Sequence, residues 1–254
     1  MRSERELYDG IATSDGDAAL SYYAKAAPRL RLSRLAAAAR RLRPRTVLDL
    51  GCGDGVALER LRQELPDAAL LGLDFSAVAL GRVRGRGLDA LLGDCASLPL
   101  RPAYADLVVA SEVLEHVADV PAALAEARRV LKPGGTLLIT VPVADWFKCL
   151  AGMSDPARVK YLDEQTHRRE WAIRKFGKFG PLSALLDELR DQGFAIKRRR
   201  GIFYWVWRFE PLADRATARW PLAVPAMLAG EWPLSVVPGS RCMGKYLLIE
   251  AERS

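Results

Sequence analysis

Residues 46–55, TVLDLGCGDG, decide the fold, because an apolar strand pattern runs directly into a turn that contains three glycines. Such a turn lets the backbone adopt positive φ angles and approach a ligand closely, just before the next helix presents its N-terminus. The glycines are spaced G-x-G-x-G, whereas the dinucleotide-binding fingerprint would need its third glycine at Val56. Asp49 would also lie near a dinucleotide's negatively charged pyrophosphate. The segment therefore favours a ligand that bears an ammonium group over a dinucleotide.

The segments that follow alternate between strand and helix patterns. The predicted strands are residues 46–50, 69–75, 89–95, the first part of 105–117, and 136–143, and the predicted helices are 56–65, 76–87 and 121–135. Strands and helices of these lengths form βαβ units, whose right-handed crossovers give a parallel sheet covered on both faces. We therefore predict a doubly wound α/β fold.

The sequence predicts a single domain with additions around its core, because its length suits one domain and the alternation stops after residue 143. The predicted parts are, in chain order, N-terminal helices at 1–45, the ligand-binding core at 46–143, substrate-lid insertions at 144–180 and 203–240, and a last strand at 244–252. A helix at 182–193 and a strand that begins at residue 194 separate the two lid insertions.

The composition excludes several classes of protein. Half of the 254 residues are apolar and 27% are charged, which is typical of a soluble globular chain and not of a disordered or fibrous one. Four widely spaced cysteines without a CxxC pair, and only two histidines, favour neither a disulfide framework nor a metal site. The charged N-terminus, MRSERELYDG, predicts no export signal, so we expect a cytoplasmic protein.

Carboxylates recur at the predicted carboxyl ends of the strands, which is where open α/β sheets bind ligands. Asp74 follows the glycines by about 20 residues, a position from which an acid accepts hydrogen bonds from ribose hydroxyls. Asp94, with the amide of Cys95, could address the amino group and ring nitrogens of an adenine. Ser111 and Glu112 end the fourth strand. This set suits a positively charged ligand with amino, ribosyl and adenyl parts.

The ordered segments VLDLGCGDG, LGLDFS, GDCASLP, ASEVLEHV and LKPGGTLLITVP resemble those of class I S-adenosylmethionine-dependent methyltransferases. The similarity covers residues 46–143 and points to the small-molecule type that includes ubiquinone and menaquinone biosynthesis enzymes. It implies a Rossmann-like, mostly parallel sheet of seven strands. It also implies S-adenosyl-L-methionine as cofactor and S-adenosyl-L-homocysteine as product.

The resemblance assigns cofactor-binding roles to thirteen residues. These are Asp49, Gly51, Cys52, Gly53, Gly55, Asp74, Phe75, Ser76, Asp94, Cys95, Ala96, Ser111 and Glu112. In this reading the three glycines approach the methionine part and Asp74 binds the ribose. The adenine is bordered by Asp94 and Cys95, and the methyl-bearing sulfur is flanked by Ser111 and Glu112. Both Cys52 and Cys95 are also interpreted as small buried residues or backbone donors and not as redox groups.

Few catalytic residues are expected, because methyl transfer is an in-line displacement on a carbon that the cofactor has already activated. A base is needed only when the acceptor must lose a proton, and histidine is the side chain best suited to that role near neutral pH. His116 follows Glu112 by four residues at a predicted helix start, so both could face the cofactor. His167 lies in the predicted lid and is favoured as base or acceptor anchor. The alternative is a surface histidine in a basic loop.

The excess of basic residues that gives the net charge of +7 lies after residue 147. All six tryptophans lie after residue 145. The basic run 197–200 is followed by four aromatic residues within 203–207. This pattern is typical either of contact with an anionic lipid surface or of a strand whose charges face water and whose aromatics pack beneath the lid. The apolar segment 220–238 contains four prolines and so predicts a folded cap or a membrane-lying segment, but no continuous spanning helix.

Three function classes follow, with a small-molecule methyltransferase first. Its acceptor is expected to be apolar or aromatic, such as a natural product, a quinone or a lipid-like compound. The alternatives are a methyltransferase acting on lipids or quinones at the membrane surface, and a non-catalytic module that binds S-adenosylmethionine. No nucleic-acid partner is expected, because residues 111–114 read SEVL where base-modifying relatives carry an Asn-Pro-Pro-Tyr motif. A nicotinamide oxidoreductase is a distant fourth because of Val56 and Asp49.

Overall fold

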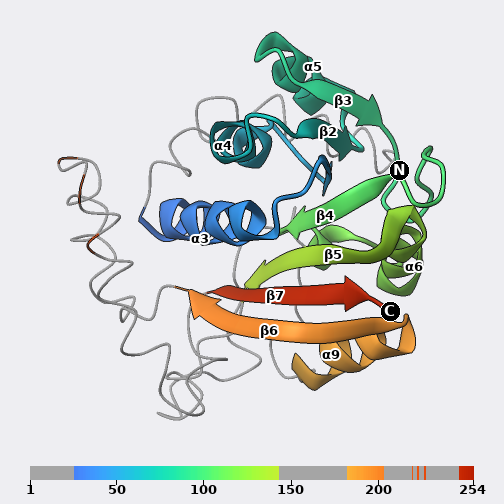
Figure 1. Ribbon diagram of the computed structural model, residues 1–254. Helices are drawn as coiled ribbons and strands as arrows, with labels where there is room; N and C mark the ends of the chain where they lie inside the picture. Colours follow the sequence, from blue (N-terminus) through green and yellow to red (C-terminus); the bar gives the residue numbers. More distant parts are fainter. Residues whose placement is uncertain (1–25, 143–181, 203–218, 220–221, 223–225, 227–245) are drawn as a thin grey trace, which may run out of the picture.

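A computed structural model describes residues 26–142, 182–202, 219, 222, 226 and 246–254 (Figure 1). The strands are β1 Thr46–Leu50, β2 Ala69–Asp74, β3 Asp89–Leu92, β4 Ala105–Ser111, β5 Leu131–Pro142, β6 Phe194–Ile202 and β7 Tyr246–Arg253. The helices are α3 Ala26–Leu42, α4 Val56–Glu64, α5 Ala77–Gly85, the 3₁₀ turn η1 Leu114–His116, α6 Val120–Val130 and α9 Leu182–Asp191.

The seven strands form one sheet in the order β3-β2-β1-β4-β5-β7-β6. Strands β1 to β5 pair in parallel, whereas β7 runs antiparallel to both of its neighbours. This arrangement confirms the predicted doubly wound, mostly parallel α/β fold. The chain moves outward from β1 through β2 to β3 and then returns to β4 on the other side of β1. Such a reversal of strand order opens a crevice at the carboxyl ends of the strands, where ligands bind.

Helices cover both faces of the sheet, because alternate residues of its buried strands point to opposite sides. On one face α3 and α4 pack against Val47, Leu107, Val109 and Leu138. On the other, α6 and α9 belong to the same buried cluster as Leu48, Val108 and Ile139. Figure 1 shows these layers on either side of the strands. The two apolar layers hold the strand ends rigidly in place, and this rigidity positions the site.

The structure corrects one predicted boundary, because β5 begins at Leu131 and the helix before it does not continue to residue 135. Leu131 pairs with Ala105 of β4, and the register then shifts before Leu107 pairs with Thr136. Backbone pairing with a neighbouring strand therefore overrides the helical pattern of RVLKPGG. Other bounds differ by a few residues, as in β7, which ends at Arg253.

Several predicted parts lie outside the described residues. Among them are residues 1–25 of the N-terminal helices and the lid insertions 144–180 and 203–240, apart from positions 219, 222 and 226. Within the ranges that are described, no helix combines the length and apolar character needed to cross a bilayer.

Candidate active site

In the glycine turn after β1, Gly51 packs closely against the protein, whereas Gly53 has open space beside it. Gly51 has a φ of 62°, and a Cβ there would lie 2.2 Å from Cγ2 of Val113. Gly53 has a φ of 52°, yet a Cβ built on it meets no atom within 4 Å. Packing against the segment after β4 therefore requires glycine at Gly51. At Gly53 the side chain would project into open space, where a ligand can approach the backbone.

Asp74, at the end of β2, ties the glycine turn to the start of α5. Its carboxylate accepts hydrogen bonds from the Gly53 amide at 2.7 Å and from the Ser76 amide at 2.9 Å. Burial raises the pKa of Asp74, while these amides and that of Phe75 oppose the rise. Ser76 in turn caps α5 by accepting a bond from the amide of Ala79. Three predicted site residues, Asp74, Phe75 and Ser76, thus form one hydrogen-bonded corner beside the turn.

Asp49 is the least satisfied polar group near this turn. It is 1% exposed, and within the part of the chain that the structure describes neither carboxyl oxygen has a hydrogen-bond partner. Burial raises the pKa of Asp49 to about 8, and the neighbouring Asp74 adds to this effect. Buried carboxyl groups are normally hydrogen-bonded, because leaving one unpartnered costs free energy. This carboxyl group is therefore suited to a cationic partner that is not part of the chain.

The residues after β3 form a tight turn on the other side of Asp74. The carboxylate of Asp94 accepts a hydrogen bond from the Ala96 amide at 2.8 Å, and the Ser97 amide donates to the Asp94 carbonyl at 3.0 Å. Asp94 itself is exposed, whereas Cys95 is buried beside the glycine turn and receives a hydrogen bond from the Gly51 amide. The turn therefore presents a carboxylate and a short stretch of backbone beside the glycines.

The thiols of Cys52 and Cys95 are expected to be unreactive. Burial raises the pKa of the Cys95 thiol to about 12 and also raises that of the Cys52 thiol, so both stay protonated near neutral pH. The Cys52 amide donates to the carbonyl of Leu73 at 3.0 Å. No group of three or more histidine, cysteine or acidic side chains suited to a metal ion occurs among the described residues.

The end of β4 is held by a buried ion pair. Glu112 has a φ of 57°, which is unusual for a residue with a side chain, and its amide donates to the Thr140 carbonyl at 2.9 Å. Its carboxylate lies 2.9 Å from Nη1 of Arg31, whose side chain is 2% exposed. The Arg31 guanidinium also lies 4.9 Å from the centre of the Tyr246 ring. Segments far apart in the sequence, α3, β4 and β7, therefore meet beside Glu112.

Comparison with known proteins identifies the family. Residues 48–139 match the profile of a methyltransferase domain. The chain is 37% identical over 170 residues to a Mycolicibacterium smegmatis protein assigned to the S-adenosylmethionine-dependent methyltransferases, covering 65% of this chain and 58% of the relative. Residues 48–139 therefore form a methyltransferase domain, and the similarity places that domain among the class I S-adenosylmethionine-dependent methyltransferases. The predicted family and its cofactor, S-adenosylmethionine, are thereby confirmed.

Two further comparisons place the methyltransferase domain more broadly. The chain is 29% identical over 192 residues to the ubiquinone biosynthesis O-methyltransferase of a Bradyrhizobium species, covering 73% of this chain and 70% of the relative. A Haloferax volcanii protein solved in complex with the Trm112 methyltransferase activator has the same fold, with a TM-score of 0.58, 22% identity and coverage of 99% and 98%. The chain spans about half the length of several curated relatives that it matches.

The residues of the methyltransferase domain fit its cofactor on two observations. The unpartnered carboxyl of Asp49 could accept the ammonium group, and the open side of Gly53 leaves room for the ligand beside the backbone. Asp74 and Asp94 add further negative charge, which suits a sulfonium cation. Both observations come from the protein alone and are independent of the sequence comparisons.

The histidine predictions have different outcomes. His116 lies half-buried in the 3₁₀ turn η1, and α6 begins only at Val120, where Asp119 caps it. The predicted helix start at His116 is a 3₁₀ turn separate from α6, and Glu112 lies before this turn and does not share a helical face with His116. The backbone of Glu112 adopts left-handed angles before the turn begins. His167 lies outside the described residues.

Sequence reasoning missed Arg31, which pairs with Glu112, and the pair Glu126 and Arg129, which binds the loop between β3 and β4. The only sequence signal for Arg31 is its place four residues before the buried Leu35, on the inner side of α3. The other two residues are spaced three apart on α6, which predicts an ordinary ion pair on a helix surface. Neither signal indicates which distant segment the side chains contact.

Proposed function

We propose that the protein transfers the methyl group of S-adenosylmethionine to a small, apolar or aromatic acceptor. The observation that carries this proposal is the buried carboxyl of Asp49, which has no hydrogen-bond partner among the described residues and precedes the glycine turn whose Gly53 is open. A buried carboxyl without a hydrogen-bond partner is unfavourable in the ligand-free protein. A bound cation would supply the missing partner and favour the charged carboxylate. The family membership and the names of small-molecule methyltransferases among its relatives support the same reading.

Each part of the cofactor has a proposed partner at a strand end. In this proposal Asp49 binds the ammonium group, and the backbone of the glycine turn at Gly51 to Gly55 follows the methionine part. Asp74 accepts hydrogen bonds from the ribose hydroxyls while it still holds the Gly53 amide. A carboxylate oxygen has two lone pairs, so both roles are compatible.

The adenine and the sulfur lie toward opposite sides of the crevice in the proposed arrangement. Asp94 and the Cys95 backbone border the adenine, beyond β2 on the side of β3. Ser111, whose hydroxyl is 2.9 Å from that of Thr140, and Glu112 flank the sulfur at the end of β4. The ion pair with Arg31 holds the Glu112 carboxylate in place.

Catalysis in this proposal consists mainly of alignment. The bound cofactor supplies a methyl group already activated for in-line displacement, and the chain excludes water and orients the acceptor. A phenol or alcohol acceptor must also lose a proton, and we propose His167 as the base or acceptor anchor. The lid insertions 144–180 and 203–240 are proposed to line the acceptor pocket.

A second candidate is the same chemistry at a membrane surface. Strand β6 forms the edge of the sheet, and Lys197, Arg198 and Arg199 are exposed on it. Lys197 also pairs with Glu252 at 3.1 Å, but the run leaves several cations facing solvent, which favours contact with anionic head groups. Sedimentation with anionic liposomes would separate the candidates, because an acceptor handled in solution requires no binding to lipid.

The decisive experiment measures cofactor binding and turnover together. Asp74→Ala should weaken S-adenosylhomocysteine binding by about 10- to 100-fold, as expected for hydrogen bonds to a charged group. Asp106→Ala is a matched control, because Asp106 binds the Arg45 and Thr46 amides at the opposite end of the strands. Isothermal titration calorimetry checks both variants. Tight binding of a nicotinamide dinucleotide, with none of S-adenosylhomocysteine, would refute the proposal.

Turnover is tested with radiolabelled S-adenosylmethionine and a panel of phenols, amines and quinols. Transfer of label to one class would identify the acceptor group. Cofactor binding without transfer to any of them would favour the non-catalytic alternative.

A further inference from the structure

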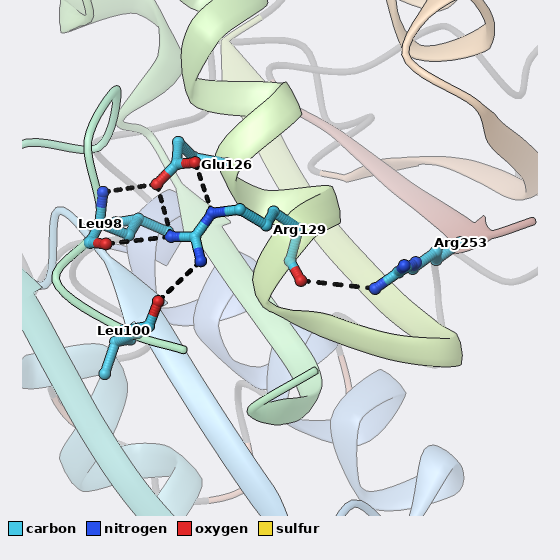
Figure 2. Close-up of polar contacts among 5 residues, drawn as sticks. All are labelled: Leu98, Leu100, Glu126, Arg129 and Arg253. Atoms are coloured by element: carbon cyan, nitrogen blue, oxygen red, sulfur yellow. Dashed lines mark hydrogen bonds and ion pairs between the residues drawn. The ribbon is translucent and has the colours of Figure 1, made fainter. Parts of the chain in front are cut away.

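The loop between β3 and β4 is held by two side chains of α6, as Figure 2 shows. The Glu126 carboxylate accepts a hydrogen bond from the Leu98 amide at 2.7 Å. Arg129 donates to the carbonyls of Leu98 at 3.0 Å and Leu100 at 2.7 Å. The two side chains also bind each other through two hydrogen bonds, at 2.6 and 2.7 Å. One ion pair therefore satisfies three backbone groups of the loop.

The same loop carries the turn that we place beside the adenine. Its first residue, Gly93, donates to the Asp74 carbonyl at 3.0 Å, and its next anchor is Leu98, which is 5% exposed. The residues between these two points are Asp94 to Ser97. Their position relative to β2 is therefore set by that backbone hydrogen bond at the start, by the buried Cys95 within the turn and by the Glu126–Arg129 pair at the end.

The pair is itself fixed from the far side of α6. Arg253 of β7 donates to the carbonyl of Arg129 (Figure 2) and to that of Leu131, and these bonds anchor the end of the helix to the sheet. The amides of Ala103 and Tyr104 donate to the carbonyls of Arg129 and Val130 at 3.0 and 2.7 Å. The helix end is thus rigid, so the side chains of Glu126 and Arg129 transmit a fixed position to the loop.

We infer that the Glu126–Arg129 pair makes the site selective for adenine by fixing the backbone of residues 94–97. This inference rests on the proposed function, because it takes the turn at Asp94 and Cys95 to be the adenine contact. Neither side chain touches the base, so both are positioning residues. Their effect depends on the geometry of hydrogen bonds to the 6-amino group and the ring nitrogen, which weaken steeply with misalignment.

This role requires the acid at position 126 and the arginine at position 129, and not the reverse. The Leu98 amide needs an acceptor, and the two carbonyls need donors in a fixed fork, which a guanidinium provides. Exchanging the residues keeps the net charge and the helix ion pair. It nevertheless faces a guanidinium toward the amide and a carboxylate toward the carbonyls. The exchange therefore removes the loop contacts selectively.

The test compares S-adenosylhomocysteine with S-inosylhomocysteine, in which hypoxanthine replaces adenine and a carbonyl replaces the 6-amino group. The full chain should bind the adenine form about tenfold more tightly or better, the usual effect of one such hydrogen bond. In the double variant Glu126→Arg with Arg129→Glu, this ratio should fall to about one, through loss of affinity for the adenine form. Glu126→Gln keeps an oxygen acceptor for the Leu98 amide and should give an intermediate ratio.

The matched control exchanges Asp187 and Arg190, an exposed pair with the same spacing on α9, and should leave the ratio unchanged. Thermal unfolding verifies that each variant is folded, and Glu126→Gln serves if the double variant is not. The inference is overturned if the folded double variant keeps the adenine preference, or if both analogues lose affinity equally. A full chain that binds neither analogue overturns the proposed function as well. Equal affinity of the full chain for both analogues overturns this inference alone.

Discussion

Replacing Asp49 by asparagine should remove most of the pH dependence of cofactor binding. Burial raises the pKa of Asp49 to about 8 in the ligand-free protein, so this carboxyl keeps its proton at neutral pH. A cationic ammonium group beside it would favour the ionised form and release that proton on binding. Affinity for the cofactor should therefore increase as the pH rises toward about 8. The asparagine side chain of the variant has no such proton to release.

The size of the effect follows from the two pKa values. Below about pH 8, complete proton release changes the dissociation constant by up to tenfold per pH unit. The stability of the ligand-free domain depends on pH in the opposite direction. Between the usual pKa of 3.8 and the buried pKa of about 8, the folded state holds a proton that the unfolded chain has released. Stability should therefore decrease across this range, by roughly 6 kcal/mol at most.

The assay is titration calorimetry with S-adenosylhomocysteine between pH 5.5 and 7.5, in buffers with different ionisation enthalpies. The wild-type chain should release up to about one proton per bound ligand. Asp49→Asn should release far fewer, with only a smaller contribution from Asp74, whose pKa burial also raises. Asp106→Asn, at the opposite end of the strands, should behave like the wild type. A wild-type affinity that is independent of pH would refute the reasoning.

Three other perturbations test separate parts of the site. Gly53→Val should abolish cofactor binding because its side chain enters the open space beside the turn, and strain at the positive φ of this position should lower stability modestly. Gly51→Ala should destabilise the fold more, because its Cβ also clashes with Val113. Thermal unfolding and calorimetry distinguish the two. Arg31→Met should lower the free energy of unfolding by about 3 to 5 kcal/mol, since it removes the ion pair that the buried Arg31 makes with Glu112. Urea unfolding should show that adding Glu112→Gln restores most of the loss, and no recovery would contradict the pair's assigned role. For a phenol or alcohol acceptor, His167→Ala should lower kcat by a factor of about 10² to 10⁴ with unchanged cofactor affinity. A variant with full kcat from pH 6 to 9 would place the base elsewhere.

Local patterns in the sequence predicted much of the fold. The alternation of apolar strands and amphipathic helices, and the glycine turn at 51–55, depend on side-chain periodicity and turn chemistry within a few residues. The order of strand-end acids, Asp49, Asp74 and Asp94, followed from the same elements. The bound of β5 at Leu131 did not, because its pairing with Ala105 depends on a neighbouring strand.

The sequence alone therefore determined the α/β class, the family and the set of strand-end residues. Only the tertiary structure decided what each polar side chain contacts. It left Asp49 buried without a hydrogen-bond partner among the described residues, brought Arg31 of α3 to Glu112 after β4, and directed Glu126 and Arg129 to the loop before β4. The physical reason is that the partner and burial of a charged side chain depend on which distant elements pack around it. Periodicity and spacing encode only the neighbours along the chain.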